Sequence, residues 1–226
     1  MSLASLRRWL GVERVEVSAR ERLVAALGGG LAIGLMVLAT HAVMPGLGGT
    51  ALVLSMAATT VLLFAVPYGA LSQPWPVLGG HVLSAVVGVA CARWIPNEAL
   101  AAGCAVGGAI AVMHAMKCIH PPGGSTALIA VLGGDGVHAL GFGFALAPVA
   151  VNALLLVGLT LAMSAALGGR RYPAAWTTAR RHAPSPPAPS HDAIVAALRD
   201  TDAFVDVTED DLVHLSRTLA EATRPR

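Results

Sequence analysis

The sequence is poor in charged side chains. Only 12% of its 226 residues are Asp, Glu, Lys or Arg, whereas a soluble domain usually has about 25%. The deficit is concentrated in residues 23–169, where the only charged residues are Arg93, Glu98, Lys117 and Asp135. Hydrophobic residues make up 55% of the chain, and the mean hydropathy is +0.69. Water cannot be the solvent for such a stretch, so the sequence excludes an ordinary soluble domain and predicts an all-α membrane protein.

The sequence also lacks several kinds of site. Its three cysteines are isolated and odd in number, which fits neither a disulfide framework nor a CxxC metal site. The phosphate-binding pattern GxxxxGK[ST] is absent, and the membrane region has only two acids, far apart in sequence. A net charge of +2 without a dense basic run gives no reason to expect nucleic acid as a partner. We therefore expect neither an enzyme nor a bound cofactor or metal.

Apolar stretches separated by helix breakers predict about five full transmembrane helices and one short one. A bilayer core about 30 Å thick takes roughly 20 apolar residues per helix. The expected full spans are residues 23–44, 47–66, 77–92, 99–116 and 137–167, the last with a kink at Pro148. The stretch 125–132 crosses less than half of the core at about 1.5 Å per residue, so it is expected as a short broken or re-entrant helix.

The placement of arginine predicts the orientation in the membrane. Arginines cluster in residues 1–22 and again after residue 169, and the positive-inside rule places both clusters in the cytoplasm. Both ends on one side require an even number of crossings, so the short helix must supply the sixth. We expect a multi-pass protein of a bacterial inner membrane with both termini cytoplasmic. Six short spans are few to enclose a private pathway, so a homo-oligomer in the lipid bilayer is expected.

Composition divides the chain into four parts. Residues 1–22 are expected to form a cytoplasmic segment and residues 23–169 the transmembrane domain. Residues 170–190 are first basic and then rich in proline, which predicts a stiff linker. Residues 191–226 are acidic, with apolar residues at helical spacing, and this pattern predicts a helical cytoplasmic tail that packs on a subunit or partner.

Two short motifs recur in the same order in the two halves of the membrane region. The run at 48–53 resembles the run at 123–129, and Gly79-Gly80-His81 resembles Gly133-Gly134-Asp135. Two repeats of three spans each would be inverted relative to one another, as in many secondary transporters. In those proteins the substrate site lies where a broken helix meets its counterpart. Short Gly-rich matches also arise by chance, so the inverted repeat is a hypothesis.

The segment from Lys117 to Pro122 has the clearest chemical signal. Its two prolines, Pro121 and Pro122, cannot donate backbone hydrogen bonds and push the preceding residue out of a helix. We therefore expect His120 to end one helix and the backbone to stay open through Pro122. Lys117, and His120 if protonated, would add positive charge to this place.

The residues that follow are suited to an anion. Gly123 and Gly124 let the chain turn, and Ser125 or Thr126 would cap the short helix. The first amides of a helix have no partner within it, and together with the positive end of the helix dipole they would bind an anion. The alternative is that Lys117 snorkels to lipid headgroups and the prolines form only a rigid turn.

Histidines offer a second function. Five of them fall in or beside the membrane domain, namely His41, His81, His114, His120 and His138. A multi-histidine site for transport of a divalent metal is therefore an alternative, although the spacings match no standard motif. His81 follows Gly79-Gly80 and is the histidine expected to face the same cavity as His120. A non-transporting membrane scaffold is the other alternative.

Two motifs resemble a known family. The run from His120 to Ala130, and the run from Pro67 through Gln73-Pro74 to His81, are similar to the HPP family of small integral membrane proteins, named for its His-Pro-Pro motif. The resemblance covers roughly residues 20–167. It implies four or more transmembrane helices, and plant plastid and cyanobacterial relatives are linked to nitrite transport. Gly123-Gly124-Ser125 replaces the more frequent Ala-Gly-Ala, a mild departure.

Taken together, these patterns predict a transporter or channel for a small inorganic anion, with nitrite as the first guess. The predicted substrate-binding residues are Lys117, His120, Pro121, Pro122, Gly123, Gly124, Ser125, Thr126 and His81.

Overall fold

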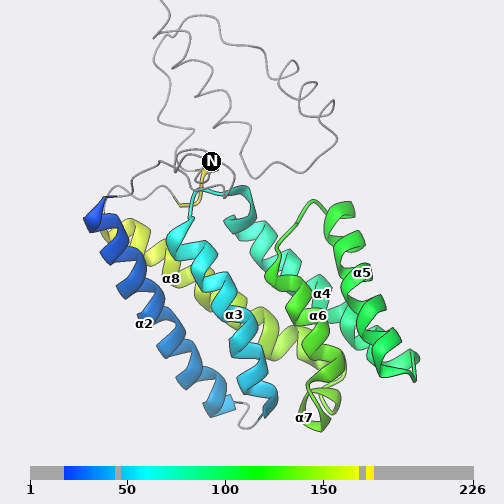
Figure 1. The fold of residues 1–226 in the computed structure, drawn as a ribbon. Helices are drawn as coiled ribbons and strands as arrows, with labels where there is room; N and C mark the ends of the chain where they lie inside the picture. Colours follow the sequence, from blue (N-terminus) through cyan, green and yellow to red (C-terminus); the bar gives the residue numbers. More distant parts are fainter. Residues whose placement is uncertain (1–17, 44–46, 168–171, 176–226) are drawn as a thin grey trace, which may run out of the picture.

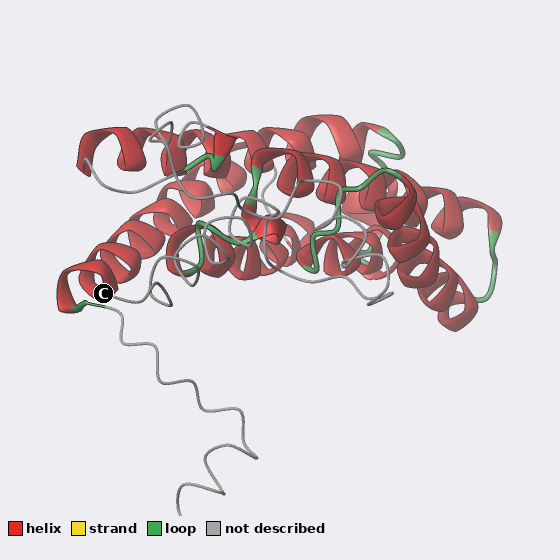
Figure 2. Cartoon of the chain, turned by 90° about the horizontal axis from the view of Figure 1, so that it is seen from above, coloured by secondary structure: helices red, strands yellow, loops and turns green. Residues whose placement is uncertain are grey.

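The computed structural model describes residues 18–43, 47–167 and 172–175, and within these ranges the chain is helical and has no strand (Figures 1 and 2). Its elements are α2 (Ala19–Val43), α3 (Leu47–Ala65), a 3-10 turn η1 (Ala70–Ser72), α4 (Pro74–Trp94), α5 (Glu98–Ala115), α6 (Pro122–Leu132), α7 (Asp135–His138), a π-helical turn η2 (Ala145–Ala150) and α8 (Val151–Leu167). The linker and tail predicted over 170–190 and 191–226 lie almost wholly outside the described residues.

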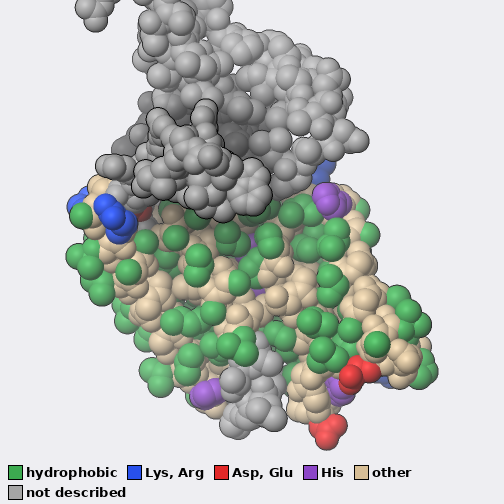
Figure 3. Space-filling model, in the orientation of Figure 1, with side chains coloured by type: hydrophobic (Ala, Val, Ile, Leu, Met, Phe, Trp, Pro, Cys, Tyr) green, Lys and Arg blue, Asp and Glu red, His purple; other side chains and the backbone are tan. Residues whose placement is uncertain are grey.

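Four helical stretches are long and apolar enough to cross a membrane, namely α2, α4, α5 and the continuous helix formed by η2 and α8. Shorter apolar helices are Leu52–Ala65 within α3 and the 11-residue α6. The predicted fold class, an all-α membrane protein with one short helix, is confirmed. On the face shown in Figure 3, apolar side chains are spread along the sides of the helices, where lipid would contact them, and acidic side chains are most visible at the lower right.

Successive long helices run in opposite directions (Figure 1). An extended connection leads from the end of α5 into α6, which continues the descent toward α7. The start of α2 lies beside the end of α8, where the Arg20 guanidinium donates to the Leu167 carbonyl at 3.4 Å. A short helix prolonged by extended chain is the element that would supply the sixth pass expected from the arginine pattern.

The two halves of the chain make matching helix contacts, in which the third helix of each half packs against the other half. The third helix of the first half, α4, packs against α5 and α6, and the last helix, α8, packs against α2 and α3. The middle helices α3 and α6 contact each other, as do α4 and the η2–α8 helix. This is the pattern that two inverted three-helix repeats with exchanged third helices would produce.

The start of α6 differs from the sequence-based expectation. The backbone is already helical from Pro122, so the prediction that it stays open through Pro122 is wrong. Proline fits the first turn of a helix because the N–H that it lacks would have no partner there. The predicted caps are also wrong, since Pro121 is the N-cap and the Thr126 hydroxyl lies in the second turn, 3.3 Å from the Pro122 carbonyl.

The last and third spans also have different bounds. The span predicted over 137–167 is broken into α7 and the helix from Ala145, because Gly141 adopts a left-handed φ of 50° between them. Pro148 lies in the π-helical turn, where a kink was predicted. The third span, expected over 77–92, is α4 and already begins at Pro74, so its first turn contains prolines and the motif Gly79-Gly80-His81 lies in its second turn.

Candidate functional site

Five hydrogen-bonding side chains are buried together where α3, α4 and α6 meet. This polar cluster consists of Ser55, Thr59, His81, His120 and Thr126, and four of them have 0% of their surface exposed, Ser55 having 3%. α3 supplies Ser55 and Thr59 from successive turns, and α4 and α6 supply His81 and Thr126. His120 comes from the extended connection before α6. Because these helices belong to both halves of the chain, the cluster joins the halves.

The Thr59 hydroxyl links the two histidines. Its oxygen lies 2.7 Å from Nε2 of His81 and 3.0 Å from Nε2 of His120. The two imidazole rings meet edge to face, with centroids 4.8 Å apart and planes at 63°. Both histidines therefore direct the same ring nitrogen at one hydroxyl group.

The chain of hydrogen bonds extends beyond this pair in both directions. His120 Nδ1 lies 2.9 Å from the Leu71 carbonyl oxygen. On the other side, His81 Nδ1 lies 2.7 Å from the Thr126 hydroxyl, which is 2.8 Å from that of Ser55. The Ser55 hydroxyl is also within donating distance of the Pro122 carbonyl, at 3.1 Å.

A backbone carbonyl fixes the direction of these hydrogen bonds. The Leu71 carbonyl can only accept, so we assign the hydrogen of neutral His120 to Nδ1. Nε2 of His120 is then an acceptor, and the Thr59 hydroxyl donates to it. Because that hydroxyl has only one hydrogen, the Thr59 oxygen accepts from Nε2–H of His81.

The donors and acceptors around His81 follow from this assignment. Neutral His81 with its hydrogen on Nε2 has an acceptor at Nδ1, so the Thr126 hydroxyl donates to that nitrogen. The Thr126 oxygen in turn accepts from Ser55. The cluster thus has one consistent set of donors and acceptors, in which the two histidines are opposite tautomers.

Glycines allow the broken helix to approach α4 this closely. A Cβ on Gly80 would lie 2.5 Å from Cβ of His120, and one on Gly123 would lie 2.8 Å from both the Gly80 carbonyl oxygen and the Ser84 hydroxyl. Ser84 Oγ is fully buried and has no hydrogen-bond partner in the part of the chain that the structure describes. A spare hydroxyl donor therefore faces the first turn of α6.

The predicted site residues separate into two groups. Buried at or beside the polar cluster are His81, His120, Pro122, Gly123 and Thr126, whereas Lys117, Pro121 and Ser125 are exposed and Gly124 is half-buried. The first amides of α6 have partners, because Gly123 N–H donates to the His120 carbonyl at 2.8 Å and Gly124 N–H to the Pro121 carbonyl at 3.0 Å. An anion at these amides would have to replace those bonds.

Lys117 has an unusual backbone conformation at the end of α5. Its φ is 54°, a left-handed value that is costly for a residue with a side chain. Lys117 N–H donates to the His114 carbonyl and Cys118 N–H to the Met113 carbonyl, at 3.1 and 2.9 Å. This pair of bonds is a Schellman motif, whose left-handed position is usually glycine.

Gln73 and Asn152 connect elements that are distant in sequence. The Gln73 side chain donates to the Pro67 and Gly69 carbonyls and accepts from Ala174 N–H at 2.9 Å, which ties the residues after α8 to the connection before α4. Asn152 donates to the Thr40 hydroxyl at 3.0 Å. This bond joins α8 to α2 in the interior of the membrane domain.

Sequence reasoning missed Thr59 and Ser55, which complete the polar cluster. Their signal is a spacing of four residues in an apolar helix, which puts two hydroxyls on one helix face. Of the five histidines in the membrane region, the structure brings only His81 and His120 together. Among the described residues there is no group of three or more His, Cys, Asp or Glu side chains that could hold a metal ion.

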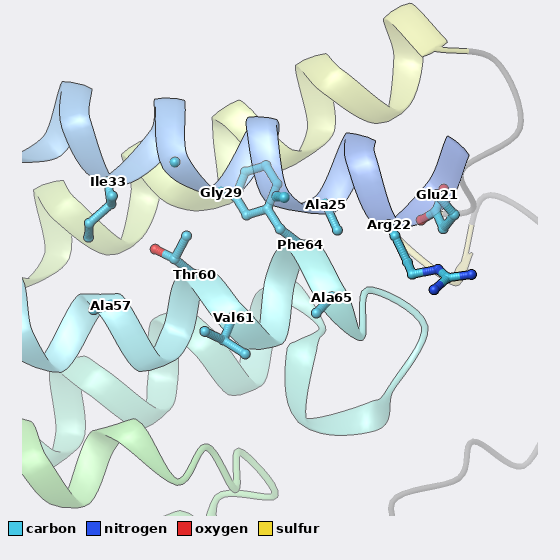
Figure 4. A pocket seen from close by; sticks show the side chains of 12 residues that line it. Glu21, Arg22, Ala25, Gly29, Ile33, Ala57, Thr60, Val61, Phe64 and Ala65 are labelled. Atoms are coloured by element: carbon cyan, nitrogen blue, oxygen red, sulfur yellow. The ribbon is translucent and has the colours of Figure 1, made fainter. Parts of the chain in front are cut away.

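A separate groove opens between α2 and α3 (Figure 4). It has a volume of about 910 Å³ and is lined mainly by small and apolar side chains, with Arg22 at one end and Phe64 along its wall. None of its lining residues belongs to the polar cluster. Thr60 lies in this groove, and its hydroxyl donates to the Met56 carbonyl of its own helix at 2.9 Å.

Comparison with known proteins agrees with this architecture. Residues 14–173 match the family model described as "HPP, transmembrane region". Two transmembrane proteins of Dictyostelium discoideum are 36% and 38% identical over 126 residues, which cover 54% of this chain and 40% and 44% of the relatives. The chain therefore spans less than half the length of these relatives. No solved structure is significantly similar.

The matched region contains every helix that the structure describes and the whole polar cluster, including the His-Pro-Pro motif at His120. This multi-pass membrane protein therefore belongs to the HPP family.

Proposed function

We propose that this protein moves a small inorganic anion across a bacterial inner membrane through the polar cluster, with nitrite as the first guess. The observation that carries this proposal is the complete burial of two histidines and their hydroxyl partners in a domain surrounded by lipid. Polar and ionisable groups inside a membrane are costly and commonly mark a substrate pathway. Their place where the short helix α6 meets α3 and α4 is the kind of place where secondary transporters bind substrate.

The chemistry of the cluster suits an oxyanion. Nitrite can only accept hydrogen bonds, and the cluster is rich in hydroxyl and imidazole donors. These donors now bond to one another, so substrate would enter as the first turn of α6 separates from α4. Gly80 and Gly123 form the close contact that would have to open. Ser84, which has no bond to lose, is the donor best placed to meet the anion.

The charges at the two faces support an orientation. Arg20, Arg22 and Lys117 lie with Glu21 on the face where α2 begins and α5 ends, whereas Arg93 lies with Glu98 and Asp135 on the opposite face. The positive-inside rule then makes the first face cytoplasmic. Lys117 would attract anions to this opening through its charge, without touching the buried cluster. A homo-oligomer remains part of the proposal.

Flux into proteoliposomes tests the function. Purified protein is reconstituted, and uptake of nitrite, nitrate, formate and chloride is compared with uptake by protein-free liposomes. We expect nitrite uptake well above that background. Removing the free donor with Ser84→Ala should raise the nitrite KM roughly tenfold, as expected for a lost hydrogen bond to a charged group.

Ser164→Ala is the matched control, because Ser164 Oγ is also buried without a partner among the described residues but lies on α8. It should leave the nitrite KM unchanged. Wild-type protein that moves none of the four anions faster than empty liposomes would refute the proposed function. An unchanged KM in Ser84→Ala would remove Ser84 from the site.

A further inference from the structure

We propose that the anion crosses together with one proton, which the His81–His120 pair holds. This inference rests on the proposed function and deepens it, because it makes the protein an electroneutral symporter of a proton and a small anion. It is argued from the charges near the polar cluster and from the hydrogen bonds within it.

A buried anion needs a positive charge beside it. The charged side chains of the described residues are Arg20, Glu21, Arg22, Arg93, Glu98, Lys117 and Asp135, and none of them is buried. A monovalent anion in the dry interior would therefore have no cation beside it, and burying an unpaired ion costs several kcal/mol. In the polar cluster the imidazoles are the side chains that can bind a proton and become positive. A proton on the histidine pair is thus the counter-charge that the site can supply.

Other titratable groups on the surrounding elements cannot take this role. Cys118 is buried against Gly79 of α4, and a thiol is either neutral or negative. His114 at the end of α5 is exposed, and His138 of α7 bonds the Val131 carbonyl at 2.9 Å. The groups that α3 and α6 present to the histidines are hydroxyls, and η1 presents the Leu71 carbonyl.

The polar cluster can gain a proton without losing a hydrogen bond. When His81 binds a proton at Nδ1, this nitrogen donates to the Thr126 oxygen. The Thr126 hydrogen then turns to the Pro122 carbonyl, 3.3 Å away. Nε2–H of His81 still donates to Thr59, and Thr59 still donates to His120. Every buried donor and acceptor in this set keeps a partner.

The proton can pass between the histidines through one hydroxyl. His81 gives its Nε2 hydrogen to the Thr59 oxygen while Thr59 gives its own hydrogen to Nε2 of His120. One N–H and one O–H bond break, and one of each forms. The rings are 4.8 Å apart, so repulsion would oppose a second proton. The pair therefore holds one proton, which can lie on either side of Thr59.

Simultaneous recording of charge, anion and proton movement tests this inference. A nitrite gradient is imposed on proteoliposomes, lumen pH is followed with a trapped dye, and current is recorded on supported membranes. Protein-free vesicles correct for nitrous acid that crosses the bilayer unaided. We expect one proton to enter per anion and no net current. Nitrite uptake that carries a current and causes no protein-dependent acidification of the lumen would overturn proton coupling and leave the proposed function intact. Absence of any uptake would refute the proposed function itself.

Glutamine variants locate the proton. His81→Gln and His120→Gln can still bond Thr59 but cannot bind a proton, so each should lower proton-coupled uptake at least tenfold. His138→Gln is the matched control and should keep one proton per anion, because His138 lies outside the polar cluster and bonds the Val131 carbonyl. Wild-type coupling in both glutamine variants would overturn the assignment. If these variants fail to fold, ¹⁵N NMR of the wild-type imidazoles tests the inference instead. We expect hydrogen on Nε2 of His81 and on Nδ1 of His120 at high pH. Titration of neither ring would refute the inference.

Discussion

At the scale of single residues, Thr59 is the side chain on which the polar cluster depends. It bonds both imidazoles, and Thr59→Val would leave two buried Nε2 atoms without a partner. Each orphaned group costs about 1–3 kcal/mol, so we expect the free energy of unfolding to fall by about 2–6 kcal/mol. Denaturant titration in detergent micelles, followed by circular dichroism, would measure this change.

A neighbouring threonine provides the control for this prediction. Thr60 is also buried, but its hydroxyl donates only to the Met56 carbonyl of its own helix. Thr60→Val should therefore cost less than about 1 kcal/mol, and Thr59→Ser should keep most of the wild-type stability. Equal losses in Thr59→Val and Thr60→Val would mean that the link between the histidines has no special energetic role.

Lys117 combines backbone strain with a proposed role for its charge, and two variants separate the two. Lys117→Gly relieves the left-handed φ of 54° and should raise the free energy of unfolding by about 1 kcal/mol, whereas Lys117→Ala keeps the strain. If the charge attracts anions, both variants should lower nitrite uptake at low ionic strength, and the loss should vanish at high salt. Uptake equal to wild type in both would remove Lys117 from the pathway, and no gain in stability for Lys117→Gly would contradict the strain.

At the scale of helices, the sequence correctly predicted a break in the segment around His-Pro-Pro. It placed the end of that break too late, after Pro122. Proline both ends helices and starts them, and Pro122 does the second. Thr59 could not be assigned to the site, because hydroxyls in apolar helices also bond their own backbone, as Thr60 does. His81, which follows Gly79-Gly80, was predicted to face the same cavity as His120. The structure places the two rings in contact.

The crossing of α4 and α6 depends on Gly88. A Cβ at this position would overlap the Ala127 carbonyl oxygen and lie 2.7 Å from Cβ of Ala130. Gly88→Ala should therefore push the helices apart and lower the free energy of unfolding by about 1–3 kcal/mol. Gly107 of α5 has open space where its Cβ would lie, so Gly107→Ala should be neutral or stabilising. Thermal unfolding midpoints in detergent would compare the two, and a Gly88→Ala midpoint at or above that of Gly107→Ala would contradict the tight crossing.

At the scale of the whole molecule, the even number of passes expected from arginine placement stays a prediction, and it requires α6 to complete one pass. The exchange of α4 and α8 between the halves was not readable from the sequence, because short Gly-rich motifs do not show which helices pack together. Residues such as Gly88 acquire their role only once that packing is known. The topology nevertheless predicts which loops share a side of the membrane, because the connections before α4 and before α5 lie on opposite faces.

Labelling of single cysteines tests this sidedness. In a variant without Cys91, Cys104 and Cys118, one exposed position is changed to cysteine at a time, using Tyr68→Cys, Pro96→Cys and Gly136→Cys. The last two lie on the face with Glu98 and Asp135, so an impermeant maleimide should label them in intact bacterial cells after the outer membrane is opened. Tyr68→Cys lies on the arginine-rich face and should react only after the inner membrane is permeabilised. Labelling of Tyr68→Cys alone in intact cells would invert the proposed orientation, and labelling of Pro96→Cys and Gly136→Cys from different sides would mean that the broken helix does not complete a crossing.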